Sequence, residues 1–260
     1  MSRNHYIDLL KFIAIVTMII DHIGNYLLPD DLFTTQVTRG IGRVAMPLFF
    51  IVHGYLLAQL SHLPSFVRSL KFLIYASFLT LATYSVTGNF TPDILFYFVA
   101  IDVFWSVTLV NLLDKYRVLL LYFFALIISL VLLLTLDIIY SGVDFGRSYG
   151  VYPFFYSLAG LILGVSPCNK GNQNISMLLL VTTLSVQYNL FLVLIYSFII
   201  KLSMIYYALP TILIPFLFWY VPHAKVNFSL PSPVIIISRN ALNIYIVHLI
   251  LIVIALNLLM

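Results

Sequence analysis

The sequence contains very little charge, one cysteine and no glutamate. Charged residues make up 8% of the 260 residues, against 62% hydrophobic ones. A soluble domain carries about 25% charged residues, so this composition cannot cover a water-exposed surface. One cysteine excludes an internal disulfide framework, and 11 glycines and 11 prolines exclude collagen-like chains. Because all nine acidic residues are aspartates, any mechanism that needs a glutamate is excluded.

Long hydrophobic runs make up most of the sequence. A helix needs about 20 mainly apolar residues to cross the hydrocarbon layer of a membrane. Backbone groups in lipid must be paired, and the runs show no strand-like alternation, so they indicate helices. We therefore predict an all-α, polytopic membrane bundle that forms a single domain over residues 1–260, with about nine transmembrane helices (eight to ten). The spans are expected at residues 7–28, 44–62, 67–87, 92–113, 117–138, 150–165, 175–200, 203–221 and 236–259.

The loops between these runs predict the orientation, because cytoplasmic loops are enriched in lysine and arginine. With nine helices and the N-terminus inside, the inner side carries Arg3, Arg68, Lys71, Lys115, Arg117, Lys170, Lys225 and Arg239, and the outer side carries Arg39, Arg43, Arg147 and Lys201. This excess favours an N-in, C-out arrangement. The basic residues form no continuous stripe, so nucleic acid is not an expected partner.

The first predicted span contains several ionisable residues, which at membrane depth usually face a cavity or a partner. Asp21 and His22 are adjacent, and an imidazole beside a carboxylate can act as a general base. The alternative is a pair of interface residues at a helix end. Lys11 shares a helical face with His22, and it can instead extend toward the interface and pair with Asp8.

The second predicted helix opens with two arginines, Arg39 and Arg43, four residues apart and just before the apolar run 44–62. If the helix begins by residue 39, both guanidinium groups point the same way, and such a pair suits a phosphate or a developing oxyanion. The alternative is a pair of interface anchors that bind Asp30 and Asp31.

Further polar residues are candidates for lining a cavity: His53, Asp102, Arg147, Asn243, Tyr245 and His248. His53 and Asp102 fall within the second and fourth spans, where an aspartate must be protonated or paired. Tyr245 and His248 are three residues apart and share a face of the last span. The six histidines have no zinc-binding spacing and no nucleotide fingerprint is present, so no metal is predicted.

Residues 10–24 read LKFIAIVTMIIDHIG, and residues 39–55 read RGIGRVAMPLFFIVHGY. These segments contain the elements K-x-x-A…M-x-x-D-H-I-G and I-G-R-x-A-x-P-x-F, followed by Gly-Tyr. Together they resemble the TraX family. Tyr-Gly-Val at 149–151 and the closing Tyr245-x-x-His248-Leu also fit. The segment 238–245 is more similar to the ending of the acyltransferase-three family, which leaves the acceptor open.

The resemblance implies an acetyltransferase of the bacterial inner membrane that belongs to the wider transmembrane acyltransferases. It implies acetyl-CoA as acyl donor, and N-terminal acetylation of pilin or of a related envelope substrate. Asp21 and His22 would be the catalytic acid–histidine pair, and Arg39 and Arg43, with Lys11, would bind the donor. The expected partners are the lipid bilayer and an acyl acceptor, which is a pilin-like protein, a glycan or a small molecule.

Three points stay open at the level of the sequence. N-in topology places Asp21 and His22 toward the outer face, although acetyl-CoA is cytosolic. Either the donor's long arm reaches through a central channel, or the orientation is reversed. Two other functions are alternatives: a proton-coupled transporter with a relay formed by Asp21, His53, Asp102 and His248, and a structural subunit of pilus or envelope assembly.

Overall fold

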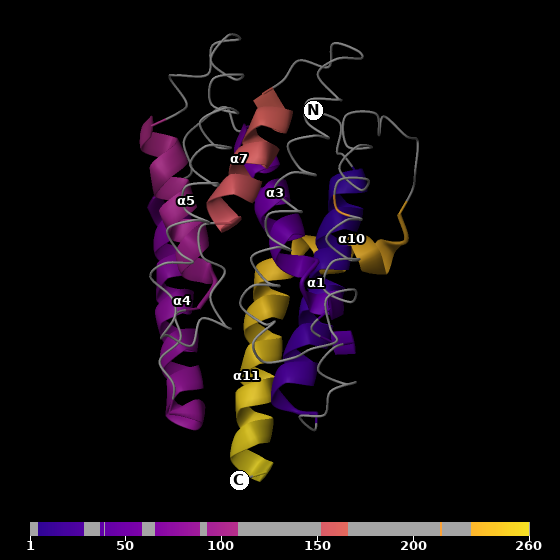
Figure 1. Ribbon diagram of the computed structural model, residues 1–260, viewed down its shortest axis with the longest axis vertical. Coiled ribbons are helices and arrows are strands. Elements are labelled where there is room, and N and C mark those ends of the chain that lie inside the picture. Colours follow the sequence, from indigo (N-terminus) through magenta and orange to yellow (C-terminus); the bar gives the residue numbers. More distant parts are fainter. Residues whose placement is uncertain are drawn as a thin grey trace, which may run out of the picture.

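The computed structural model describes residues 5–28, 37–38, 40–58, 66–88, 93–108, 152–165, 214 and 230–259. All regular structure in these residues is helical, which confirms the predicted all-α class (Figure 1). The helices are α1 (His5–Tyr26), α3 (Ala45–Ala58), α4 (Phe66–Thr87), α5 (Leu95–Thr108), α7 (Tyr152–Val165), α10 (Ser232–Arg239) and α11 (Ala241–Leu259). Three stretches of these residues are long and apolar enough to cross a membrane: Gly40–Ala58, Ser69–Val86 and Ala241–Leu258. The spans expected at 117–138 and 175–200 lie outside the described residues, as does the span expected at 203–221 apart from residue 214.

Helix α3 forms the centre of the described bundle and packs against both α1 and α7. It is hydrophobic all round, as expected of a helix enclosed by other helices. Its closest neighbour is α7, and glycines make this approach possible. A Cβ atom on Gly54 would overlap the carbonyl oxygen of Ser157, and one on Gly160 would overlap that of Ile51. Small residues that let two backbones touch are typical of helix pairs in membranes.

Helix α1 buries a stripe of residues three and four positions apart, the period of one helical face. The stripe contains Leu10, Ala14 and Met18, and it also contains Asp21. Exposed Val16 lies off the stripe. The same helix therefore contributes apolar packing along most of its length and a buried carboxylate near its end.

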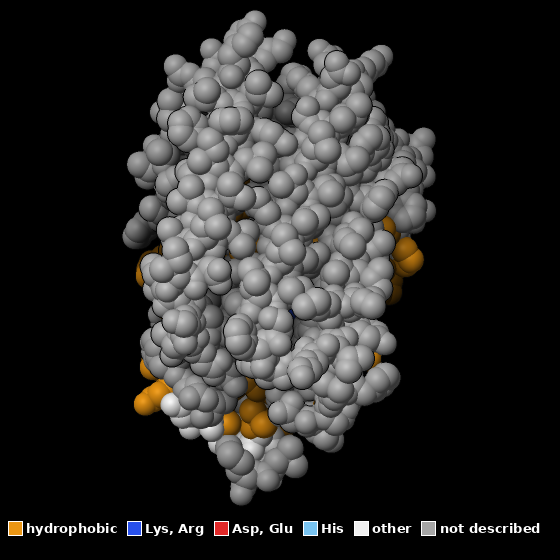
Figure 2. Space-filling model, viewed as in Figure 1, with side chains coloured by type: hydrophobic (Ala, Val, Ile, Leu, Met, Phe, Trp, Pro, Cys, Tyr) orange, Lys and Arg blue, Asp and Glu red, His pale blue; other side chains and the backbone are white. Residues whose placement is uncertain are grey.

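Helices α4 and α11 lie at the edge of the described bundle and contact each other. They expose large apolar side chains, including Ile74, Phe78 and Leu81 on α4 and Leu251 and Leu258 on α11. In Figure 2 the described side chains that reach the visible face are almost all hydrophobic. Apolar surface of this kind fits contact with lipid, and it agrees with the membrane character read from the composition.

The last predicted span, 236–259, is divided in the structure. α10 ends at Arg239, and α11 begins at Ala241 and runs to Leu259. Between them, the backbone N–H of Asn240 donates to the carbonyls of Ile236 and Ile237, which closes the first helix. Figure 1 shows α10 running across the axis of α11, and α10 packs on α1. The bend lies at the polar run Ser238-Arg239-Asn240, which the predicted span included.

Candidate active site

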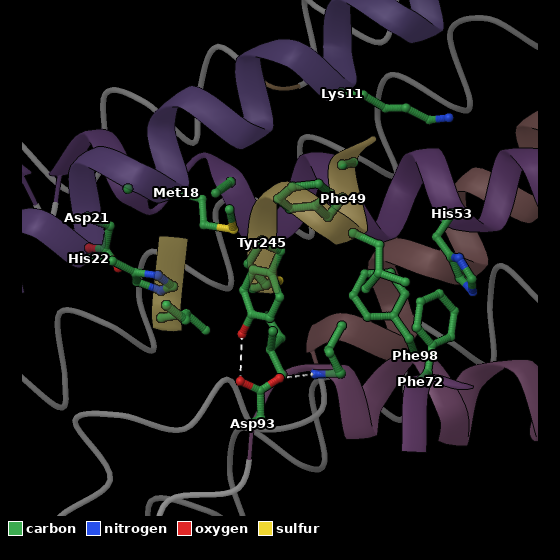
Figure 3. Close-up of a pocket in the computed structure, with 18 of the residues that line it drawn as sticks. Lys11, Met18, Asp21, His22, Phe49, His53, Phe72, Asp93, Phe98 and Tyr245 are labelled. Carbon is green, nitrogen blue, oxygen red and sulfur yellow. Dashed lines mark hydrogen bonds between the residues drawn. The ribbon is translucent and has the colours of Figure 1, made fainter. Parts of the chain in front are cut away.

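A cavity of about 320 Å³ lies among α1, α3, α4, α5 and α11. Its walls include four charged residues and five phenylalanine or tyrosine rings. Figure 3 shows Asp21 and His22 on one side of the cavity and His53 on the other, with Phe49 and Tyr245 between them. The polar residues that line it are Lys11, Asp21, His22, Asn25, Tyr26, Arg43, His53, Thr80, Thr83, Asp93 and Tyr245.

His22 is hydrogen-bonded to a second histidine that comes from the opposite end of the chain. Nδ1 of His22 lies 2.8 Å from Nε2 of His248, and Nδ1 of His248 lies 2.9 Å from the carbonyl oxygen of Ile244. A carbonyl only accepts, so His248 must carry its hydrogen on Nδ1. When both rings are neutral, Nε2 of His248 is then the acceptor and Nδ1 of His22 the donor. This leaves the lone pair of His22 on Nε2.

Tyr245 packs against both rings of this pair. The centroid of its ring is 6.2 Å from that of His22 and 5.5 Å from that of His248, and the two imidazoles themselves stack at 5.0 Å. Tyr26 lies edge-on to His22 from α1, at 6.1 Å. His22 is thereby held between aromatic rings from α1 and α11, and His248 packs against Tyr245 and His22, which restricts the rotation of each ring.

The hydroxyl of Tyr245 donates a hydrogen bond of 2.7 Å to Oδ2 of Asp93 (Figure 3). Asp93 lies in the connection between α4 and α5. Its Oδ1 accepts from the backbone N–H of Leu95 at 2.9 Å, and its own N–H donates to Oγ1 of Thr80 at 2.9 Å. Burial raises the pKa of the Asp93 carboxyl from 3.8 to about 6, against the opposing effect of the hydrogen bonds from Leu95 and Tyr245.

A second histidine of the cavity, His53, also has a buried partner. Its Nε2 lies 2.9 Å from Oδ1 of Asp102, which is 1% exposed. The ring of His53 stands edge-on to Phe98 at 4.9 Å. Both imidazoles that line the cavity are thus backed by a hydrogen-bonding group that is not itself among the lining residues: His248 behind His22, and Asp102 behind His53.

Arg43 and Asp21 bring buried charge to the same cavity. They are 6% and 7% exposed, respectively, and both line it. Gly42 lets these segments approach, because a Cβ atom at this position would overlap the side chain of Asp21. The start of the second predicted span and the end of the first are therefore in direct contact.

Most residues expected at the site are found around this cavity. Lys11, Asp21, His22, Arg43, His53 and Tyr245 line it, and His248 and Asp102 stand directly behind the two lining histidines. Asn243 is different: it is exposed on α11 and is not among the described residues of the cavity wall. Arg39 and Arg147 lie outside the described residues.

Asp93 is the main residue of the cavity wall that the sequence did not identify as a candidate. It follows Pro92 at the predicted start of the fourth span, where an aspartate reads as a helix cap. The span predicted to begin at 92 begins at Leu95 in the structure, and Asp93 does bond the first helical N–H. Its contact with Tyr245 joins residues 152 positions apart and has no local signal in the sequence.

The family model described as TraX protein matches residues 6–154, more than half of the chain. The chain belongs to the TraX family. The matched segment contains Asp21 and His22 of α1, Arg43 in the turn before α3, and the residues that α3 brings to the cavity. His248 and Tyr245 lie beyond it and reach the site only through the fold.

Similarity to a bacterial protein adds no function. An uncharacterized protein of Rickettsia prowazekii (strain Madrid E) is 46% identical over 54 residues, which is 21% of this chain. The alignment covers 20% of that protein, so the chain spans about a fifth of the length of this curated relative. No solved structure matches the chain.

Proposed function

We propose that this TraX-family protein is an acetyltransferase of the bacterial inner membrane that moves an acetyl group from acetyl-CoA to an amine or hydroxyl acceptor. The observation that supports this most directly is the hydrogen bond between His22 and His248, which leaves a lone pair on Nε2 of His22. His22 lines a cavity that also holds a buried cation and a buried carboxylate. Acyl transfer needs a base for the attacking group and a positive or hydrogen-bond-donating group for the developing oxyanion.

In this proposal, His22 acts as the general base. As the acceptor attacks the carbonyl carbon of the thioester, its N–H or O–H proton passes to Nε2 of His22. The C–S bond then breaks, the sulfur keeps the electron pair, and His22 returns the proton to it. His248 keeps Nδ1 of His22 protonated throughout by accepting its hydrogen bond, so only Nε2 exchanges a proton.

Arg43 and Asp21 supply the electrostatic part of the proposal. A buried guanidinium stabilises negative charge on the thioester oxygen or on donor phosphate more strongly than an exposed one does, because little water screens it. Asp21 stabilises the imidazolium that His22 becomes when it holds the proton. Arg43 and Asp21 therefore suit the reaction of an acyl thioester, and no step of the proposal needs a metal.

The shape of the cavity bears on how a cytosolic donor reaches this base. Lys11 and His22 both line it and stand 11 residues apart on α1, about 16 Å along the helix axis. In the N-in orientation Lys11 is nearer the cytosol. We propose that Lys11 binds the anionic part of acetyl-CoA and that the donor's arm follows the cavity toward His22.

The experiment that tests the donor is acetyl-CoA titration by calorimetry of the detergent-purified protein and of Arg43→Ala. The matched control is Arg239→Ala, which removes an exposed arginine on α10. We expect saturable binding by wild type and by the control, and at least about tenfold weaker binding by Arg43→Ala. Absence of binding by folded wild-type protein would contradict the proposal.

A proton-coupled carrier is a second candidate, and the observation that favours it is the His53–Asp102 pair. An aspartate that is 1% exposed beside an imidazole is the kind of group that holds and releases protons in transporters. The two functions differ in what they require. A carrier in proteoliposomes responds to an imposed pH gradient without acetyl-CoA, whereas the acetyltransferase works without a gradient.

A further inference from the structure

We infer that Asp93 is a positioning residue of the site, which holds the His22–His248 pair in its working arrangement through its hydrogen bond with Tyr245. The effect on acyl transfer rests on the proposed function. The effect on the geometry of the two histidines is independent of the proposed function, because it requires no reaction to take place.

Asp93 ties together three helices that surround the cavity. Its N–H bonds Thr80 on α4, Oδ1 accepts the first helical N–H of α5, and Oδ2 accepts the hydroxyl of Tyr245 on α11. The Asp93 side chain also lines the cavity. The position of the Tyr245 hydroxyl is therefore fixed relative to α4 and α5 and not only by its own helix.

The ring of Tyr245 transmits this position to the histidines. It lies 6.2 Å from His22 and 5.5 Å from His248, centroid to centroid, one turn before His248 on the same helix. A ring that changes its rotamer would leave space beside both imidazoles. Because the His22–His248 hydrogen bond depends on the orientation of two rings, it would then lose its fixed geometry.

The hydrogen bond from Tyr245 to Asp93 also excludes one catalytic role for Tyr245. A phenol has one hydrogen to donate, and Tyr245 directs it to Asp93. While this bond exists, Tyr245 does not donate to the oxygen of an acyl group. Its contribution is therefore to the orientation of the histidines.

Four variants of the full-length protein in detergent test this inference. Tyr245→Phe removes only the hydroxyl, and Asp93→Ala removes the acceptor. Asp93→Asn is the conservative variant, because a carboxamide can still bond both Tyr245 and the N–H of Leu95. Tyr84→Phe is the matched control, since it makes the same chemical change at an exposed position on α4.

The first readout is the nitrogen NMR spectrum of the six histidines, with the His22 and His248 signals assigned from His22→Ala and His248→Asn. We expect both rings to carry their hydrogen on Nδ1 in wild type. Tyr245→Phe and Asp93→Ala are expected to give mixed tautomers at these two positions, while Asp93→Asn and Tyr84→Phe keep the wild-type signals. Wild-type signals in folded Tyr245→Phe would overturn the inference.

The second readout is acetyl transfer, measured as release of free CoA with a synthetic peptide that has a free α-amine and with octyl glucoside as a hydroxyl acceptor. We expect kcat of Tyr245→Phe to fall between about tenfold and 100-fold, with unchanged acetyl-CoA affinity, as for a misplaced catalytic group. An equal loss of acetyl-CoA affinity would overturn the inference and make Tyr245 a donor-binding residue. If wild type transfers no acetyl group while the histidine signals change as expected, the proposed function fails and the positioning by Asp93 stands.

Discussion

Nδ1 of His22 and Nε2 of His248 lie 2.8 Å apart although 226 residues separate them in the sequence. One histidine comes from the first described helix and the other from the last. The acceptor of the His22 hydrogen is therefore an imidazole that is itself oriented by the carbonyl of Ile244. Since a helix carbonyl cannot rotate freely, the direction of the whole chain of hydrogen bonds is set by the backbone of α11.

The first prediction concerns His248→Ala. It removes the acceptor of the His22 Nδ1–H, so that His22 can place its hydrogen on either nitrogen. By analogy with the loss of the group that orients a catalytic histidine, kcat for acetyl transfer is expected to fall about 100-fold to 10⁴-fold. Acetyl-CoA affinity, measured by calorimetry, should remain within about twofold, because His248 is not among the described residues of the cavity wall.

Asn243→Ala is the control for this prediction, because Asn243 is an exposed residue on the same helix. It should keep wild-type kcat. A His248→Ala protein that is folded and as active as this control would show that His22 needs no orientation by His248.

The sequence predicted the helical class and the candidate residues of α1 and of the turn before α3 for local reasons. Apolar runs of the right length indicate spans, and Asp21, His22 and Arg43 stand out because ionisable groups are unusual there. Three other contacts depend on which helices pack together: His22 with His248, Asp93 with Tyr245, and His53 with Asp102. Hydropathy does not encode this packing, since one apolar helix resembles another.

The second prediction concerns the glycine contact of α3 with α7. Gly160→Ala places a methyl group against the carbonyl of Ile51 and forces the two helices apart. We expect a loss of stability of about 1–3 kcal/mol or more, the usual range for overpacking in a close-packed interior. The measurement is thermal unfolding in detergent, and Gly88→Ala serves as comparison because nothing lies within 4 Å of its Cβ position.

Gly88 has a φ of 67°, so its replacement has a backbone cost of its own, of about 1 kcal/mol. A larger loss for Gly160→Ala than for Gly88→Ala is therefore the expected order. The reverse order would argue that the α3–α7 contact is loose enough to absorb a methyl group.

The third prediction is a dependence of stability on pH that comes from Asp93. Its pKa is about 6 in the folded protein, against 3.8 for a carboxyl in the unfolded chain, so between these values the folded state binds more protons than the unfolded state. The contribution of this group to stability is then present below pH 3.8 and is lost as the pH rises to about 6. The upper limit of the loss is about 3 kcal/mol.

Asp93→Asn removes this titration and keeps the size of the side chain. The difference in melting temperature between Asp93→Asn and wild type should therefore move in favour of the variant as the pH is raised from about 4 to about 7. Taking this difference cancels the titration of the histidines, which both proteins share. A difference that is constant across this range would contradict the raised pKa of Asp93.

The last prediction concerns the His53–Asp102 pair. Asp102→Ala removes the carboxylate that His53 contacts, and removal of one partner of a buried ionisable pair typically costs about 3–5 kcal/mol. The double variant His53→Ala/Asp102→Ala removes both groups together, so its loss should be smaller than the sum of the two single losses. Thermal unfolding in detergent of four proteins (wild type, His53→Ala, Asp102→Ala and the double variant) measures this coupling.

The same four proteins separate packing from proton chemistry at this end of the cavity. His53 and Asp102 lie on α3 and α5, and His53 is 11 residues from Gly42, about 16 Å along the helix from the contact with Asp21. At that distance the pair cannot share a reacting atom with His22, so variants that fold should keep most of the wild-type kcat for acetyl transfer at saturating acetyl-CoA. If they abolish a response to an imposed pH gradient that wild-type proteoliposomes show, the pair carries protons and the carrier becomes the better description of this protein.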